Sequence, residues 1–258
     1  MPTPATLTRR RFMSISGSAA IAAATMPSSG VAASNLRFKA VVFDAFPIFD
    51  PRPVAQLAEQ VHPGSGAALV AAWRSRQFEY QWLRALGGQY VDFLQATEDS
   101  LIFAARQTGL ELTPEKRAKL MNAYHNLTVW PDAAENLHRL HDAGLRLGFL
   151  SNMTKAMLDS GLEKSGLGSL FEHVLSTDAR KTYKPAAAAY QLALDAFALS
   201  RAEILFVAFA GWDAAGSKWF GYPTFWTNRA GSPAEELGVA PDGTGQDLGA
   251  LVKFVLAT

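Results

Sequence analysis

Residues 40–46 read Ala-Val-Val-Phe-Asp-Ala-Phe, a continuous apolar run that ends abruptly at the acidic residue Asp44. A short apolar run with a polar boundary is typical of a strand that is buried on both faces of a parallel sheet. Working outward from this stretch, similar runs occur at residues 145–150, 204–210 and 223–226, and more weakly at residues 173–176.

Helix-like segments fill the intervals between these runs. They cover residues 132–142, 155–165, 186–198 and 213–220. Strands that alternate with helices predict a parallel sheet with helices on both faces. We therefore expect an α/β fold, a doubly wound parallel sheet with a Rossmann-like core.

One interval breaks this alternation. Between residues 51 and 124 only helical patterns occur, over residues 66–86 and 90–107 and in a helix that Thr113 caps and Pro114 begins. A block of helices directly after the first strand indicates an inserted cap over the sheet edge. We expect a helical cap domain over residues 51–125 and an α/β core domain of residues 34–50 and 126–258.

The first 33 residues have the form of an export signal. Arg9, Arg10 and Arg11 precede Phe12, a weakly apolar stretch and three small residues that end at Ala33. This pattern resembles a twin-arginine signal, which carries folded proteins out of the cytoplasm. It predicts the export machinery as a partner, cleavage after Ala33 and a periplasmic mature protein. The apolar stretch is too short for a stable membrane anchor.

The composition excludes several classes of function. The 24 basic and 23 acidic residues give a net charge of +1 without a basic run, so we expect no nucleic-acid partner. The chain has no cysteine, which removes thiolate nucleophiles and thiolate metal sites. A dinucleotide fingerprint and a phosphate loop are both absent from the sequence, and His138 and His141 lack the further ligands of a zinc site. We therefore expect neither a cofactor nor a metal.

Polar residues follow the predicted strands at the points where the strands end. Asp44, Ser151, Asn152 and Asp213 occupy such positions, and Lys184 follows the weakest strand. In open α/β sheets the ligand lies beyond the carboxyl ends of the strands, so these side chains are expected at one edge. A buried Asp44 beside a lysine would stay ionised and would suit covalent catalysis through an aspartyl intermediate. The alternatives are an aspartate that only caps a turn and a lysine that is solvated.

Several motifs occur in a characteristic order along the chain. They are Phe43-Asp44-Ala45-Phe46, Trp73-Arg74, residues 77–84 and 95–99, Leu150-Ser151-Asn152, Tyr183-Lys184-Pro185 with Tyr190, and Phe206-Val207 with residues 212–216. Together these motifs resemble the L-2-haloacid dehalogenases, the type II members of the haloacid dehalogenase superfamily. The similarity covers essentially the whole chain from about residue 38 onward.

The resemblance implies a hydrolase that displaces halide from the α-carbon of a short 2-haloacid or a related carboxylate. By this likeness Asp44 attacks the carbon and forms an ester, and Arg74 meets the departing halide or the substrate carboxylate. Lys184 holds and polarises the nucleophile, and Asp213 orients the water that hydrolyses the ester. The same likeness assigns substrate binding to Phe46, Phe93 and Trp212 around the halogen, to Ser151 and Asn152 at the carboxylate, and to Tyr190. The other cap aromatics are left for helix packing and for subunit contacts in a homodimer.

Phosphatases of the same superfamily are the nearest alternative enzymes. They resemble one another in a second aspartate two residues after the nucleophile, with a magnesium ion nearby, whereas this chain has Phe46 at that position. A phenylalanine neither transfers a proton nor binds a cation. Phosphoryl transfer is therefore disfavoured.

Two loops depart from the dehalogenase pattern. The loop from Asp44 to Ile48 is one residue shorter, lacks a threonine hydroxyl, and contains Pro47, which has no N–H. Ala208 and Ala210 stand where the family commonly has serine and asparagine. A lost hydrogen bond to a charged group is worth about 1.5–3 kcal/mol, so we expect slowed ester hydrolysis or a more apolar substrate. A non-catalytic periplasmic protein that binds small carboxylates is the alternative from another functional class.

Overall fold

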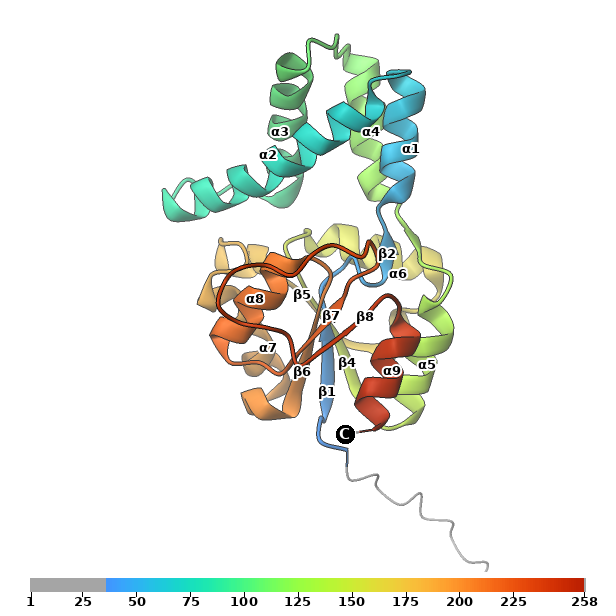
Figure 1. Cartoon of the computed structure of the whole chain (residues 1–258), viewed down its shortest axis with the longest axis vertical. Helices are drawn as coiled ribbons and strands as arrows, with labels where there is room; N and C mark the ends of the chain where they lie inside the picture. The colour runs from blue at the N-terminus through green and yellow to red at the C-terminus, as the bar shows by residue number, and fades with distance from the viewer. Residues whose placement is uncertain (1–35, 258) are drawn as a thin grey trace, which may run out of the picture. The chain divides into compact units, whose positions relative to one another are not determined.

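The computed structural model describes residues 36–257, in which an α/β core lies beneath a layer of helices (Figure 1). Within these residues a parallel sheet of six strands has the order β5-β4-β1-β6-β7-β8. The strands are β1 (Ala40–Phe43), β4 (Arg146–Ser151), β5 (Phe171–Ser176), β6 (Ile204–Ala208), β7 (Thr224–Thr227) and β8 (Gly243–Gly245). The predicted α/β fold with a parallel sheet is confirmed.

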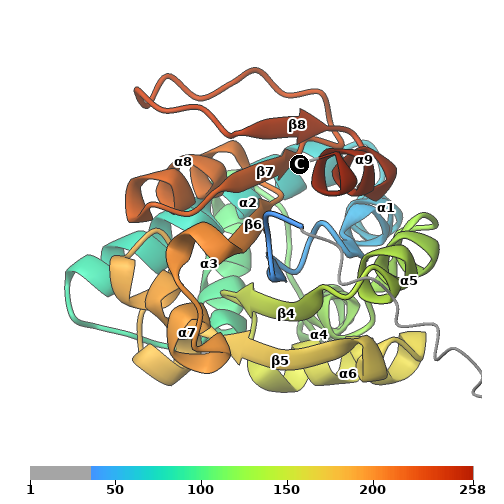
Figure 2. The same ribbon diagram turned by 90° about the horizontal axis from the view of Figure 1, so that it is seen from below.

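Helices cover both faces of this sheet. Figure 2 shows α5, α6 and α9 on one face and α7 and α8 on the other. Their bounds are α5 (Ala133–Asp142), α6 (Lys155–Ser165), α7 (Ala187–Phe197), α8 (Gly211–Phe220) and α9 (Leu248–Leu256), with 3₁₀ turns η1 (Gly168–Leu170), η2 (Thr177–Arg180) and η3 (Arg201–Glu203).

The strand β1 lies between β4 and β6, near the middle of the sheet, and this position requires its continuous apolar sequence. Val42 lies opposite Gly148 on β4 and opposite Phe206 on β6. Val41 and Phe43 belong to the cluster that α5, α6 and α9 cover, whereas Ala40 and Val42 belong to the cluster under α7 and α8. Both clusters therefore hold the strand whose end carries Asp44.

The helices α1–α4 form the layer above the sheet edge (Figure 1). Two short antiparallel strands, β2 (Phe49–Asp50) and β3 (Thr128–Val129), flank this layer in the sequence. Their positions explain how the chain leaves the core after Asp44 and returns to it. The cap helices are α1 (Arg52–Val61), α2 (Gly66–Leu86), α3 (Phe93–Gln107) and α4 (Pro114–His125).

Two cap helices begin at side chains that bind the first free backbone N–H groups. Thr113 caps α4, whose first residue is Pro114, as expected. The helix expected from residue 90 instead begins at Phe93, because the Asp92 side chain accepts a hydrogen bond from the Gln95 N–H. Residues 90–92 therefore belong to the connection between α2 and α3.

Other elements differ from the sequence-based expectation. The helices α1 and α9 were not expected, and neither was β8, a Gly-Thr-Gly strand without apolar side chains. An added Cβ at Gly243 would lie 2.8 Å from the rings of Phe225 and Phe254, so only glycine fits there. The strand expected to reach residue 210 ends at Ala208, because Ala210 is the N-cap of α8.

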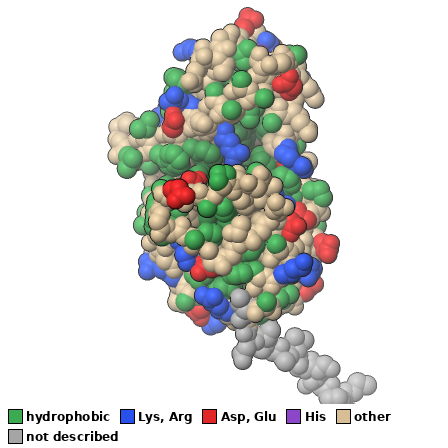
Figure 3. Space-filling model, viewed as in Figure 1, with side chains coloured by type: hydrophobic (Ala, Val, Ile, Leu, Met, Phe, Trp, Pro, Cys, Tyr) green, Lys and Arg blue, Asp and Glu red, His purple; other side chains and the backbone are tan. Residues whose placement is uncertain are grey.

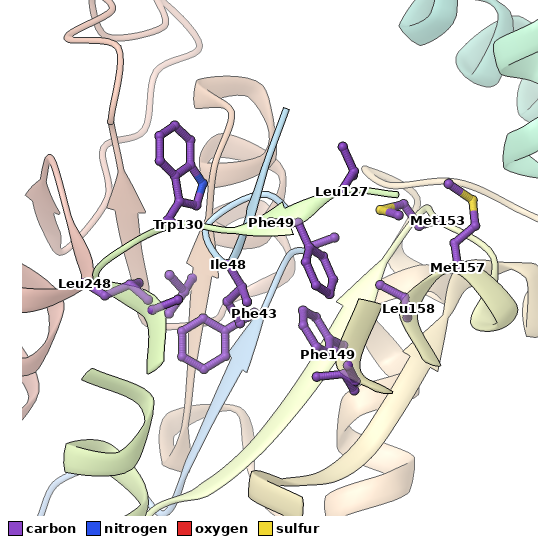
Figure 4. Close-up of a cluster of buried hydrophobic side chains, with 14 of the residues drawn as sticks. Phe43, Ile48, Phe49, Leu127, Trp130, Phe149, Met153, Met157, Leu158 and Leu248 are labelled. Atoms are coloured by element: carbon purple, nitrogen blue, oxygen red, sulfur yellow. The ribbon is translucent and has the colours of Figure 1, made fainter. Parts of the chain in front are cut away.

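A cluster of buried side chains holds the turn that follows Asp44 (Figure 4). Phe49 stacks on Phe149 with 5.6 Å between the ring centroids, and Ile48 is fully buried in the same cluster. The Trp130 backbone N–H donates to the Ile48 carbonyl, and its indole N–H donates to the Phe46 carbonyl, each at 2.9 Å. Ile48 therefore stabilises the core, and the turn is held by packing and by backbone hydrogen bonds.

The predicted export signal lies outside the described residues. Among residues 36–257 no helix is long and apolar enough to cross a membrane.

Hydrophobic side chains gather on the surface where the end of α2 projects over the core (Figure 3). Leu86 and Trp219 are largely exposed there and line one surface cavity.

Candidate active site

Two carboxylates and one lysine form a buried cluster at the carboxyl edge of the sheet. Lys184 Nζ lies 2.8 Å from Asp44 Oδ1 and 2.6 Å from Asp213 Oδ2. Asp44 follows β1, Asp213 lies in the first turn of α8, and Lys184 lies in the loop before α7 rather than at the start of that helix. Lys184 and Asp213 are each 1% exposed, so water screens their charges poorly.

Burial and charge act in opposite directions on this cluster. Burial lowers the pKa of Lys184, but the charges of Asp213 and Asp44 outweigh it and leave that pKa above its ordinary value. Burial raises the pKa of Asp213 to about 6, although the charge of Lys184 opposes this shift. Lys184 therefore stays protonated, while Asp213 is able to take up and release a proton near neutral pH.

The two oxygens of Asp44 have different surroundings. Oδ1 accepts hydrogen bonds from Lys184 Nζ at 2.8 Å and from Ser151 Oγ at 3.2 Å. Oδ2 accepts one longer bond from a described residue, 3.3 Å from the Phe46 backbone N–H. Oδ1 is thus fixed by a charged partner, and Oδ2 is the oxygen that remains available to attack an electrophile.

Tyr190 holds Asp213 from the side of the core. Its hydroxyl donates to Asp213 Oδ1 at 2.6 Å, and its side chain is fully buried. Gly216 permits this contact, because an added Cβ would lie 2.6 Å from the Tyr190 hydroxyl and 2.7 Å from Pro185. Tyr190 is not among the residues that line the cavity beside Asp44, and its hydroxyl binds Asp213 instead, so its expected role in substrate binding stays a prediction.

A cavity of about 30 Å³ lies between the sheet edge and the cap. The other predicted site residues all reach it. The core contributes Asp44, Phe46, Ser151, Asn152, Lys184, Phe209, Ala210, Trp212 and Asp213, and the cap contributes Arg74, Phe78, Gln81 and Phe93.

Sequence reasoning missed three of these lining residues as members of the site. Phe78 and Gln81 lie four and seven positions after Arg74 on α2, which places all three on one face of the helix. That spacing was a signal that could have identified them once Arg74 was chosen. Phe209 directly follows β6, so it also occupies the strand-end position that marks ligand sites in such sheets.

Arg74 presents a positive charge to this region from the cap. Its guanidinium lies 5.8 Å from the ring centroid of Phe78 and 5.7 Å from that of Phe209. It forms no ion pair with any other residue of the range 36–257. A second cavity of about 170 Å³ lies next to the first and shares Phe46, Arg74, Phe78 and Phe209 with it. The unneutralised charge between the two cavities suits an anionic ligand.

Metal-ligating side chains do not gather elsewhere in the described part of the chain. No group of three or more histidine, aspartate or glutamate side chains among residues 36–257 is placed to hold a metal ion. His138 and His141 lie exposed on α5. Phe46, at the position where the related phosphatases have a second aspartate, packs against Phe209 in the cavity, with 5.8 Å between the ring centroids.

Known proteins share this fold and sequence over most of the chain. The family profile of haloacid dehalogenase-like hydrolases matches residues 19–221. The (S)-2-haloacid dehalogenase of Pseudomonas sp. (strain YL) is 40% identical over 217 residues, which cover 84% of this chain and 94% of the relative. Haloacetate dehalogenase H-2 of Moraxella sp. (strain B) is 36% identical over 220 residues, which cover 85% and 98%.

Solved structures agree with these sequence relatives. The crystal structure of the L-2-haloacid dehalogenase RSc1362 is 44% identical and has a TM-score of 0.83, covering 84% of this chain and 98% of that one. The L-2-haloacid dehalogenase of Xanthobacter autotrophicus with chloropropionic acid covalently bound is 34% identical and has a TM-score of 0.77, with the same coverage. The chain therefore belongs to the haloacid dehalogenase-like hydrolases, and among them to the family of the (S)-2-haloacid dehalogenases.

Proposed function

We propose that the chain hydrolyses short 2-haloalkanoic acids to 2-hydroxy acids and halide through an ester on Asp44. The observation that carries this proposal is a carboxylate in the cavity with one oxygen held by Lys184 and Ser151 and the other available. The family relative from Xanthobacter autotrophicus, solved with chloropropionic acid covalently bound, supports a covalent route.

In the first step Asp44 Oδ2 attacks the carbon that bears the halogen. The new carbon–oxygen bond forms as the carbon–halogen bond breaks, and the halide leaves with the bonding electron pair. Lys184 orients Asp44 before the attack, because its ammonium pairs with Oδ1. Arg74 offers its guanidinium to the departing halide or to the substrate carboxylate.

In the second step a water molecule attacks the carbonyl carbon of the Asp44 ester. One water proton passes to Asp213, whose pKa of about 6 suits a base that acts near neutral pH. The ester bond to the substrate oxygen then breaks, the proton passes to that oxygen, and the 2-hydroxy acid is released. Asp44 regains two oxygens, one of which comes from the water, and the second water proton is released to solvent.

Single-turnover reaction in ¹⁸O water followed by mass spectrometry of the protein tests this route. We expect label in the Asp44 carboxylate and unlabelled hydroxyl in the product. Product that forms while Asp44 stays unlabelled would reject the ester. A protein that binds lactate, as judged by a raised melting temperature, yet releases no halide would be the carboxylate binder instead.

We also propose that ester hydrolysis is the slower step. Ala210 lines the cavity next to Asp213, and Ala208 is fully buried at the end of β6, so neither side chain offers a hydrogen bond to the attacking water. Rapid mixing with 2-chloropropanoate should show a burst of halide followed by a slower steady rate. Ala210→Asn should reduce the burst and raise the steady rate by up to roughly tenfold, the effect of one hydrogen bond. Steady halide release without a burst in the unmodified protein would contradict this order of steps.

We further propose that residues 1–33 direct export and are removed, so that the enzyme acts in the periplasm. The arginine triplet, the weakly apolar stretch and the small residues before Ser34 support this proposal. Intact mass measurement of protein from the periplasmic fraction should show a chain that begins at Ser34. A mass that still includes Met1 to Ala33 would overturn it.

A further inference from the structure

Gln81 has a buried amide group with one donor that no described residue pairs. It lies on α2, it is fully buried, and it lines the catalytic cavity. Its Oε1 accepts a hydrogen bond from Asn152 Nδ2 at 2.8 Å, but its Nε2 has no partner within residues 36–257. A buried unpaired amide N–H destabilises a protein unless a ligand or water accepts from it.

The orientation of the Gln81 amide follows from a backbone group. The Lys184 backbone N–H, which is always a donor, lies 2.9 Å from the Asn152 side-chain oxygen. The Asn152 side-chain nitrogen must therefore face Gln81, and Gln81 must accept this hydrogen bond with its side-chain oxygen. The chain of bonds from the core leaves Gln81 Nε2 as the unpaired atom.

A second buried glutamine on the same helix shows the ordinary arrangement. Gln77 lies one turn earlier on α2, is 3% exposed, and donates from Nε2 to Thr97 Oγ1 at 2.6 Å within the cap. The cap therefore pairs Gln77, which lines the neighbouring cavity, and leaves unpaired the glutamine that lines the cavity beside Asp44. Trp212 Nε1 is also buried and unpaired, but its ring lines the surface cavity beside α2 as well, so it does not single out the catalytic cavity.

We propose that Gln81 Nε2 donates a hydrogen bond to the carboxylate of the 2-haloacid and so positions the substrate from the cap. The inference rests on the proposed function and adds a residue to it. Asp44 and Asp213 carry two negative charges against the single positive charge of Lys184. Ser151 and Asn152, which were expected to hold the carboxylate, already donate to Asp44 Oδ1 and to Gln81 Oε1. A substrate carboxylate is repelled from the cluster and is drawn toward the polar groups of the cap, which are Arg74 and Gln81.

The same hydrogen bond would couple substrate binding to the contact between cap and core. Gln81 receives its orientation from Asn152 and Lys184, both on the core side, through the chain of bonds described above. Substrate held by Gln81 would therefore contact cap and core at once. The carbon that bears the halogen would then lie between the carboxylate, held by the cap, and Asp44, held by the core.

Gln81→Met tests this inference by removing the donor at similar volume. We expect the KM for 2-chloropropanoate and the Kd for lactate, measured by calorimetry, to rise roughly 10- to 150-fold, with a much smaller change in kcat. Gln77→Met is the matched control, because it removes a buried glutamine from the same helix. It should lower the melting temperature and leave both constants within about twofold of the unmodified values.

Gln81→Glu is the second variant, and it tests the proposed hydrogen bond even if the methionine variant does not fold. It keeps the oxygen that Asn152 binds and replaces the donor with an oxygen that repels the substrate carboxylate. Lactate affinity should be lowest at alkaline pH and should recover between about pH 8 and about pH 5.5, as the new carboxyl group takes up a proton and becomes a donor. The affinity is measured against the unmodified protein at each pH, because Arg74, Asp44, Lys184 and Asp213 line the same cavity.

The outcomes separate this inference from the proposed function. Unchanged KM and Kd in both Gln81 variants would overturn the role of Gln81 while leaving dehalogenation intact. Absence of halide release from the unmodified protein would overturn the proposed function, and the lactate affinities would still decide the role of Gln81. An unmodified protein that binds neither lactate nor 2-chloropropanoate would overturn both.

Discussion

The core side and the cap side of the cavity are built from different interactions. On the core side Asp44, Lys184 and Asp213 hold one another by short ion pairs in a buried cluster. On the cap side the lining residues are two phenylalanines, an arginine without an ion pair among the described residues, and a glutamine with an unpaired donor. The catalytic side chains of the core are paired with one another, whereas the cap offers an unpaired guanidinium and an unpaired amide donor.

This difference separates the chemistry from the recognition of the substrate. A nucleophile and a base must keep their geometry and their charge before the substrate arrives, and a satisfied network provides this. Groups that bind a ligand must keep donors and charge unsatisfied until the ligand supplies the partner. Substitutions on the two sides should therefore differ in kind, with losses of rate on the core side and losses of affinity on the cap side.

Asp44→Asn should give the largest effect, because the amide lacks the negative oxygen that attacks carbon. We expect halide release to fall by roughly 10⁴-fold or more while the protein stays folded. Halide measurement together with the melting temperature checks this result. Full turnover by a variant whose mass shows no deamidation would contradict the role of Asp44 as the nucleophile.

Lys184→Met should destabilise the protein, because it leaves two buried carboxylates without their cation. Breaking a buried ion pair in this way lowers the free energy of unfolding by about 3–5 kcal/mol. The loss should be larger at alkaline pH than at acidic pH, since protonation of Asp213 relieves the repulsion between the two carboxylates. Urea denaturation at two pH values measures it, and equal stability of variant and unmodified protein would show that the cluster does not hold the core side.

The next largest effect should be the dependence of the hydrolysis rate on pH. With a pKa of about 6, Asp213 is ionised above that pH and protonated below it. The rate of ester hydrolysis should therefore fall about tenfold per pH unit on the acid side of pH 6. Because this pKa lies above the ordinary value of 3.8, the contribution of Asp213 to stability decreases as the pH rises from 3.8 to about 6.

Tyr190→Phe sharpens that measurement. The hydrogen bond from Tyr190 lowers the pKa of Asp213 against the larger effect of burial. Its removal should move the acid limb of the rate profile toward higher pH and should leave the KM close to the unmodified value. A changed KM with an unmoved acid limb would favour the expected role of Tyr190 in substrate binding.

Trp82→Phe should have the smallest effect. The Trp82 indole N–H donates to the Lys184 carbonyl at 3.3 Å and joins the cap helix α2 to the core. Loss of this long, partly buried bond should lower the free energy of unfolding by about 0.5–1.5 kcal/mol and the melting temperature by a few degrees. Scanning calorimetry measures the shift. A loss of activity above tenfold would show that this contact supports catalysis as well as stability.

Local patterns were enough to predict much of the fold. The strand over residues 40–43 and the helices over residues 66–86 and 155–165 have the expected bounds, because continuous burial and helical periodicity are visible in the local sequence. The strand β8 left no such mark, because glycine is required there by distant residues: the rings of Phe225 and Phe254 at Gly243, and the Ala250 side chain at Gly245. Helix α8 begins before its expected start because Ala210 caps it without a polar side chain.

The sequence by itself determined that strand ends would carry Asp44, Ser151, Asn152 and Asp213, because strand period and polarity are properties of neighbouring residues. Only the tertiary structure decided that Tyr190 lies behind Asp213 and that the Gln81 amide faces the cavity. Both facts depend on contacts between segments that lie far apart in the sequence. Tyr190 contacts Asp213, and Gln81 contacts Asn152, which the Lys184 backbone N–H orients. No local pattern encodes such contacts. Residues of one type, such as Gln77 and Gln81, differ only in the surroundings that the fold provides.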